Sequence, residues 1–141
     1  MPDGFFDVKY GSMKKLLLFL ISLTAALSLQ ASVGKYADIS HDDLKAVLAS
    51  GKVTLIDVNG SESYAQGHIP AALDFDQIKS ALAAKLPKEK DALIVAYCGG
   101  PHCTAYRQAY DAALALGYTN VKHYSGGLSG WVQKGEKLAK P

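Results

Sequence analysis

Arginine and cysteine are scarce in this sequence. Of 15 basic residues only Arg107 is an arginine, and the chain has two cysteines. The formal net charge is +2 and no polybasic block occurs, so the electrostatic pattern of a nucleic-acid-binding protein is missing. Two cysteines are too few for a disulfide-rich mini-domain or a four-thiolate zinc site.

Length and apolar content are ordinary for a globular protein. The chain has 141 residues, of which 49% are hydrophobic and 20% charged. That length accommodates one domain, and the apolar fraction excludes wholesale disorder.

A composition change near the start of the sequence predicts export. Lys14 and Lys15 precede an apolar stretch over residues 16–29, and a small residue, Ala31, follows. This order of charged, apolar and small residues is typical of a cleavable secretory signal. As a membrane anchor the stretch is too short, because its helix spans about 21 Å of a hydrocarbon core about 30 Å thick.

These patterns divide the sequence into three parts. Residues 1–12 fit no targeting pattern and stay an unassigned leader, residues 13–31 form the predicted signal, and residues 32–141 form the domain. We therefore expect a periplasmic or secreted protein whose mature form has no membrane segment and meets an oxidising compartment.

Apolar runs and helical stripes alternate along the predicted domain. We expect strands at residues 53–58, 71–75, 92–97 and 121–124, with helical segments at residues 40–51, 61–70, 78–86, 104–116 and around Trp131. This alternation predicts an α/β fold, with a parallel sheet covered by helices on both faces. Ligands of such folds bind beyond the carboxyl ends of the strands.

Cys98 directly follows the most apolar of the predicted strands. Backbone N–H groups and a helix N-terminus at this position stabilise a thiolate, which is the nucleophilic form of cysteine. The alternative is a small apolar residue at the end of a buried strand. Gly99 and Gly100 argue against that alternative, because two glycines add nothing to packing there.

The second cysteine, Cys103, lies in the same loop. A disulfide with Cys98 is possible if the Cα atoms approach within about 7 Å. A metal site formed by Cys98, His102 and Cys103 is disfavoured, because the spacing matches no common zinc motif and a fourth ligand is missing. We therefore expect no metal. His102 is either a cation that attracts an anionic donor or a solvent-facing loop residue.

Three motifs in this order resemble the rhodanese-like sulfurtransferase family. The first motif lies in residues 55–58 and 64–72, which are similar to the family's Asp-Val strand and its Gly-His-Ile-Pro-Gly-Ala signature. The second is Tyr97-Cys98, which is similar to the start of the family's active-site loop. The third lies in residues 124–131 with Gly135, which are similar to the family's Gly-Gly-x-x-x-Trp ending. The resemblance covers roughly residues 39–137, almost all of the predicted domain.

The resemblance implies a central five-stranded parallel sheet and a catalytic Cys98 that carries sulfane sulfur as a persulfide. A small sulfur-containing anion such as thiosulfate or polysulfide, or a protein persulfide, would load Cys98, and a thiol or cyanide would unload it. No cofactor is implied. The substrate would lie against the loop formed by Gly99, Gly100, Pro101, His102, Cys103 and Thr104, whose backbone N–H groups (Pro101 has none) would hold the anionic sulfur.

Several positions depart from the family pattern. Cys103 stands where thiosulfate-specific members have a cationic residue, Asn59 where Arg is frequent, and Ser63 where Glu is common. Arg107, nine residues after Cys98, is too far along the helix to clamp a phosphoryl group, which excludes a cysteine phosphatase. The departure at Cys103 leaves an alternative function open: a non-catalytic binding or redox module with a Cys98–Cys103 disulfide.

Three other residues are predicted to have structural roles. His68 is expected to fix its turn through a hydrogen bond, Asp57 to anchor a neighbouring loop, and Trp131 to anchor the last helix in the core.

Overall fold

The computed structural model describes residues 35–141. The predicted leader, the predicted signal and the first three residues of the predicted domain lie outside the described residues. Within residues 35–141, no helix is long and apolar enough to cross a membrane.

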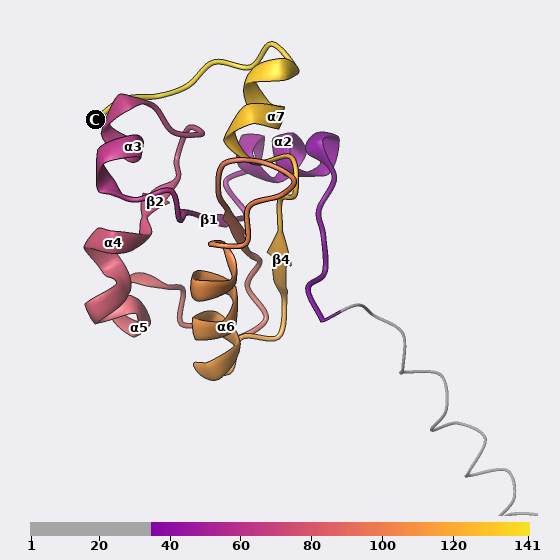
Figure 1. Cartoon of the computed structure of the whole chain (residues 1–141). Coiled ribbons are helices and arrows are strands. Elements are labelled where there is room, and N and C mark those ends of the chain that lie inside the picture. Colours follow the sequence, from indigo (N-terminus) through magenta and orange to yellow (C-terminus); the bar gives the residue numbers. More distant parts are fainter. Residues whose placement is uncertain (1–34) are drawn as a thin grey trace, which may run out of the picture. The chain divides into compact units, whose positions relative to one another are not determined.

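A parallel sheet forms the centre of the domain (Figure 1). Its strands run in the order β2-β1-β3-β4. Their bounds are β1 Thr54–Asp57, β2 Leu73–Asp74, β3 Ile94–Tyr97 and β4 Val121–His123. All pairs are parallel, with Ile56 opposite Ala96 in β1 and β3. The central strands are buried on both faces, as their continuous apolar runs predict.

The expectation of five strands is wrong in one detail, because the described sheet has four. Residues next to β4 pair with it only briefly: the Ile39 amide donates to the His123 carbonyl at 2.9 Å, and the His123 amide donates to the Ala37 carbonyl at 2.7 Å. The pairing ends there because Ser40 begins a helix. Its hydroxyl accepts a hydrogen bond from the Asp43 amide at 3.1 Å, as expected of an N-cap.

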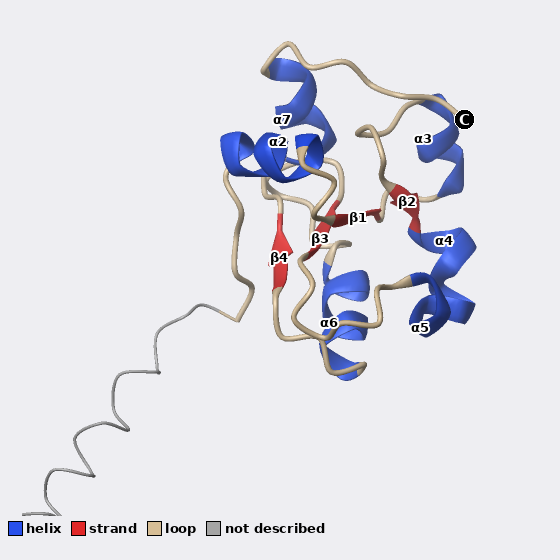
Figure 2. Cartoon of the chain, turned by 180° about the vertical axis from the view of Figure 1, so that it is seen from behind, coloured by secondary structure: helices blue, strands red, loops and turns tan. Residues whose placement is uncertain are grey.

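Helices cover both faces of the sheet (Figure 2). One face is covered by α2 (His41–Ala49) and α7 (Gly127–Gln133). The other face is covered by α4 (Phe75–Ile78), α5 (Leu82–Lys85) and α6 (Arg107–Ala115). The remaining helix, α3 (Ser61–Gln66), precedes β2. The single helix expected at residues 78–86 is divided into α4, the 3-10 turn η2 (Lys79–Ala81) and α5. The division occurs because the backbone at Ala81 leaves helical values (φ −129°, ψ 30°).

Side chains of neighbouring strand residues enter separate halves of the core. Leu55 and Val95 pack with α2 and α7, whereas Ile56 and Ala96 pack with α4, α5 and α6. This alternation follows from the two-residue period of a strand. The sheet is therefore fixed on both sides, and the loops at its carboxyl end rest on a rigid base.

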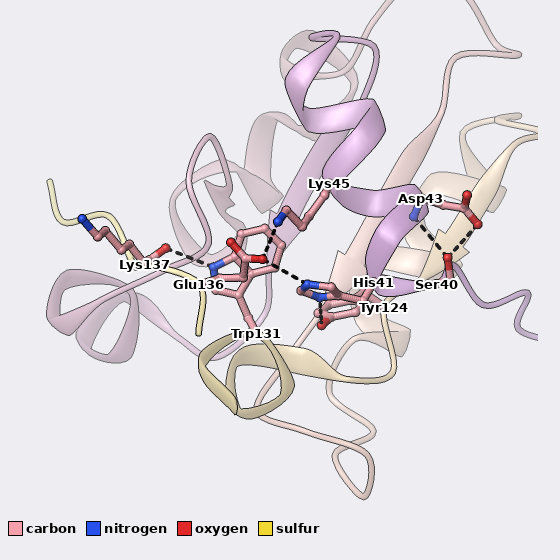
Figure 3. Close-up of polar contacts among 8 residues, drawn as sticks. All are labelled: Ser40, His41, Asp43, Lys45, Tyr124, Trp131, Glu136 and Lys137. Atoms are coloured by element: carbon pink, nitrogen blue, oxygen red, sulfur yellow. Dashed lines mark hydrogen bonds and ion pairs between the residues drawn. The ribbon is translucent and has the colours of Figure 1, made fainter. Parts of the chain in front are cut away.

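A polar network joins α2 to the C-terminal segment (Figure 3). Glu136 lies 2.6 Å from the Lys45 ammonium group and 3.3 Å from His41 Nε2. The Lys45 partner lowers the pKa of Glu136. On its other side, His41 Nδ1 lies 3.0 Å from the Tyr124 hydroxyl. The indole N–H of Trp131 donates to the Lys137 carbonyl at 3.0 Å, so the chain that follows α7 is bound back to the domain.

Ala71 has a backbone conformation that favours glycine. Its φ is +68°, and it occupies the position where the family signature has Gly. We expect Ala71→Gly to raise the free energy of unfolding by roughly 0.5–1 kcal/mol, since relief of left-handed strain exceeds the added freedom of the unfolded chain. Urea denaturation measures this change. Ala65→Gly, in the exposed part of α3, is the control and should lower stability by about 1 kcal/mol; a loss of stability in both variants would contradict the prediction.

Candidate active site

Cys98 lies at the carboxyl end of β3, in the middle of the sheet. Its side chain is 1% exposed and packs in the same half of the core as Ala96. Pairing with the neighbouring strand continues up to this point, because the Val58 amide donates to the Tyr97 carbonyl at 2.9 Å. The fold therefore places Cys98 at the edge of a parallel sheet where ligands gather.

Cys98 and Cys103 form a disulfide, an arrangement that the sequence left open. Their Cα atoms are 6.2 Å apart across a sequence separation of 5. Neither cysteine is free, so the structure does not form the disfavoured metal site from Cys98, His102 and Cys103. Elsewhere in residues 35–141, no group of three or more metal-ligating side chains gathers around one point.

The loop between the two cysteines contains a tight turn. The Cys103 amide donates to the Gly100 carbonyl at 3.1 Å, with Pro101 at the second position, where its fixed φ suits a turn. His102 is exposed at the third position, and Thr104 after the turn is exposed as well. The amides of Gly99, Gly100, His102 and Thr104 donate to no backbone carbonyl of residues 35–141. These four N–H groups are the candidates on the loop for holding an anionic sulfur.

The start of α7 supports the cysteine loop from the other side (Figure 1). The Leu128 amide donates to the Cys98 carbonyl at 2.8 Å, and the Ser129 amide donates to the Gly99 carbonyl at 2.9 Å. At Gly127, where φ is +60°, a Cβ atom would lie 2.6 Å from the Cys98 oxygen and 2.6 Å from the Gly100 nitrogen. Glycine at this position thus allows the start of α7 to contact the cysteine loop.

A buried hydrogen bond joins Tyr97, the residue before Cys98, to Asp57 of β1. The Tyr97 hydroxyl donates to Asp57 Oδ2 at 2.5 Å and accepts from the Ile69 amide at 2.9 Å. Asp57 Oδ1 also accepts from the amide and the side chain of Asn59, at 2.8 and 2.9 Å. Burial, and then the Asp57 carboxylate, raise the pKa of the Tyr97 hydroxyl far above its usual range, so Tyr97 stays a donor.

The anchoring role predicted for Asp57 is confirmed, but its partner Tyr97 was missed. The two residues lie on neighbouring strands, and no sequence spacing indicates their contact. Asn59, which stands where the family often has Arg, completes the link to the active-site loop: a Cβ atom at Gly99 would lie 3.6 Å from its side-chain oxygen. The side chain of Asn59 therefore binds Asp57 and lies close to the loop that follows Cys98.

Helix α6 starts three residues later than predicted. It begins at Arg107, because residues 104–106 form tighter turns in which the Arg107 amide donates to the Thr104 carbonyl at 3.1 Å. As predicted, the Arg107 side chain lies along the protein surface. Its guanidinium lies 5.0 Å from the centre of the Tyr36 ring and 6.0 Å from that of Tyr106. The guanidinium thus rests on tyrosine rings rather than serving as a clamp over Cys98.

A second buried histidine, His123, lies under the start of α6. His123 stacks on the Tyr106 ring at 3.4 Å, and its Nε2 has no hydrogen-bond partner among the described residues. Burial lowers the pKa of His123, while Asp38, 3.9 Å away, opposes this shift. Burial thus favours the neutral imidazole, whose ring packs flat against Tyr106.

The structural roles predicted for two further residues are confirmed. His68 Nδ1 lies 2.9 Å from the Tyr64 carbonyl, and its ring stacks on the Tyr64 ring at 3.7 Å. Trp131 is 5% exposed and packs between α7 and the sheet. Both side chains hold loops at the same end of the sheet as Cys98.

Two features define the class of this domain. One is an α/β fold with a parallel sheet, and the other is a buried cysteine that ends a central strand and begins a short loop. Residues 40–134 match the family model of the rhodanese-like domain, and the chain belongs to this family. The match covers the sheet, both helical layers and the cysteine loop.

Two relatives and one solved structure illustrate the similarity. The human thiosulfate:glutathione sulfurtransferase is 33% identical over 109 residues, covering 68% of this chain and 93% of that protein. The mouse thiosulfate sulfurtransferase/rhodanese-like domain-containing protein 3 is 30% identical over 108 residues, covering 67% of each. The structure of a human single-domain sulfurtransferase is 32% identical, with a TM-score of 0.58, and covers 69% of this chain and 96% of that one.

Proposed function

We propose that this protein is an exported sulfurtransferase that moves sulfane sulfur through a persulfide on Cys98. The observation that carries the proposal is the position of Cys98, at the end of β3 and beside a loop whose amides at Gly99, Gly100, His102 and Thr104 have no backbone partner. Such donors stabilise negative charge on a buried sulfur atom. The family and the names of its relatives support the same class of reaction.

The reaction has two displacement steps and begins from the reduced protein. The Cys98 thiolate attacks the outer sulfur of thiosulfate; the sulfur–sulfur bond breaks and sulfite leaves with its electron pair. A thiol or cyanide then attacks the outer sulfur of the persulfide, and the Cys98 thiolate leaves. Polysulfide or a protein persulfide can load Cys98 in the same way, with a shorter polysulfide or a thiolate as leaving group. No cofactor enters either step.

The loop has no fixed cation at position 103 to hold an anionic donor. The His102 imidazole is the nearest cationic candidate on the loop. Thiosulfate would therefore bind mainly through backbone N–H groups. The name of the human relative pairs thiosulfate with glutathione, which is a thiol, and this supports a thiol as the acceptor.

Two observations support export to the periplasm or the outside of the cell. Residues 13–31 have the order of charged, apolar and small residues that signals secretion. The Cys98–Cys103 disulfide fits an oxidising compartment, because such bonds seldom persist in the cytosol.

The direct test is to transfer sulfur to the reduced protein and to measure the products. After reduction and removal of the reductant, incubation with thiosulfate or polysulfide should load sulfur onto Cys98 of wild type and of Cys103→Ser. Sulfite release from thiosulfate reports the loading in both proteins, and retained mass reports it in Cys103→Ser. Cys98→Ser should give neither signal, because the proposal places the persulfide on Cys98. Intact mass, thiol alkylation and sulfite release measure the transfer. Equal sulfur uptake by Cys98→Ser, or no uptake by any variant, would reject the proposal.

A second candidate function is favoured by the disulfide itself. With Cys98 bonded to Cys103, the domain is a non-catalytic binding or redox module. Cyanide turnover before and after reduction separates the two candidates. Saturable turnover that appears on reduction supports the enzyme, whereas two titratable thiols with no turnover support the redox module.

A further inference from the structure

Cys103 lies at the far end of the active-site loop and is bonded to the cysteine that the proposed function uses. We propose that Cys103 is a resolving thiol: it attacks the persulfide of Cys98, releases sulfide and leaves the Cys98–Cys103 disulfide. This inference rests on the proposed function and adds an activity to it, the reduction of sulfane sulfur to sulfide. The disulfide in the structure is the same bond that this step would form.

The loop conformation in the structure brings the two sulfur atoms together. Their Cα atoms are 6.2 Å apart, within the range that a disulfide bridges. The turn between them is closed by the Cys103 amide and the Gly100 carbonyl, and α7 holds the other side through the Cys98 and Gly99 carbonyls. A thiol fixed in this way reacts as if at very high concentration, so it competes with any dissolved thiol.

The atoms and electrons of the step balance. The Cys103 thiolate attacks Cys98 Sγ, a bond forms between the two cysteine sulfurs, and the bond to the outer sulfur breaks. The outer sulfur leaves with the electron pair as hydrosulfide. The sulfane sulfur is reduced by two electrons, and two cysteine thiols are oxidised to a disulfide. An external thiol reductant must then reopen the disulfide before the next cycle.

The bond between the two Sγ atoms supports attack at Cys98 Sγ rather than at the outer sulfur. Cys98 is 1% exposed and Cys103 is half-buried, and the structure places their Sγ atoms in direct contact. Attack at the outer sulfur would only move the persulfide to Cys103.

A single-turnover experiment with thiosulfate tests the inference, because its two products report two different steps. Reduced protein, freed of reductant, is mixed with thiosulfate, and sulfite, sulfide and free thiols are counted per chain. Wild type should release sulfite and sulfide in equal amounts, lose both thiols and retain no added sulfur. Cys103→Ser should release sulfite without sulfide and keep one sulfur on Cys98 until a thiol is added.

The outcomes separate this inference from the proposed function. Sulfite without sulfide in wild type, with sulfur retained as in Cys103→Ser, would overturn the inference and leave the sulfurtransferase intact. If no variant releases sulfite, loading from thiosulfate fails, and the reverse reaction then decides the inference. Hydrosulfide should attack Cys98 Sγ of the oxidised wild type and displace the Cys103 thiolate, so the protein should take up one sulfur and then accept two alkyl groups, one on the Cys103 thiol and one on the Cys98 persulfide. The absence of uptake overturns the inference.

Discussion

Gly127→Ala should lower the free energy of unfolding by about 2–4 kcal/mol and nearly abolish sulfur loading of Cys98. Two physical effects add at this position. The backbone has φ +60°, which strains any residue with a Cβ atom. The new methyl group would also lie 2.6 Å from the Cys98 oxygen and 2.8 Å from the Gly100 Cα. Both atoms belong to backbone, so neither can rotate out of the way.

Gly135→Ala is the matched control for this prediction. Gly135 also has a positive φ, +80°, but nothing lies within 4 Å of the Cβ position. It should therefore show only the strain, about 1–2 kcal/mol, and load sulfur at the wild-type rate. Urea denaturation and sulfite release measure the two properties. If Gly127→Ala behaves like Gly135→Ala in both, the contact between α7 and the cysteine loop does not position Cys98.

The sheet and the position of Cys98 could be predicted because they depend on local pattern. The continuous apolar run that ends at Tyr97 can only be buried on both faces, and the residue after it must lie at the sheet edge. Ser40 was likewise predictable, since a cap needs only its own hydroxyl and the amide of Asp43. In each case the interacting groups are near neighbours in the sequence.

The remaining features depend on contacts between distant residues or on small backbone changes. The hydrogen bond between Asp57 and Tyr97 joins residues 40 apart in the sequence. The need for glycine at position 127 follows from the close approach of α7 to Gly100. The late start of α6 follows from the turns after Cys103, a change of one hydrogen-bond register. The spacing of the cysteines allowed a disulfide, but the loop conformation decides whether the sulfur atoms meet.

The buried pair of Asp57 and Tyr97 yields the second large effect. Asp57→Ala should lower the free energy of unfolding by about 3–5 kcal/mol, because the Tyr97 hydroxyl, which is fully buried, loses its acceptor and Asn59 loses both of its bonds. Asp57→Asn keeps the shape of the side chain and can still accept from Asn59. It presents an amide N–H to the Tyr97 hydroxyl and should cost about 1–3 kcal/mol.

A double-mutant cycle identifies the pair as the cause of this loss. Tyr97→Phe removes the hydroxyl, so combining it with Asp57→Asn leaves no buried hydroxyl without an acceptor, and the double variant should be more stable than the sum of the single changes by about 1–2 kcal/mol. Tyr64→Phe, which removes a single 2.7 Å bond to the Ala72 carbonyl, is the control, with an expected loss of about 1 kcal/mol and no coupling to Asp57→Asn. Urea denaturation of all variants gives the coupling energy. Purely additive losses at Asp57 and Tyr97 would show that the two side chains stabilise the fold independently.

Because Tyr97 directly precedes Cys98 and Asn59 lies beside Gly99, a coupled loss should also slow sulfur loading in each single variant, while Tyr64→Phe loads normally.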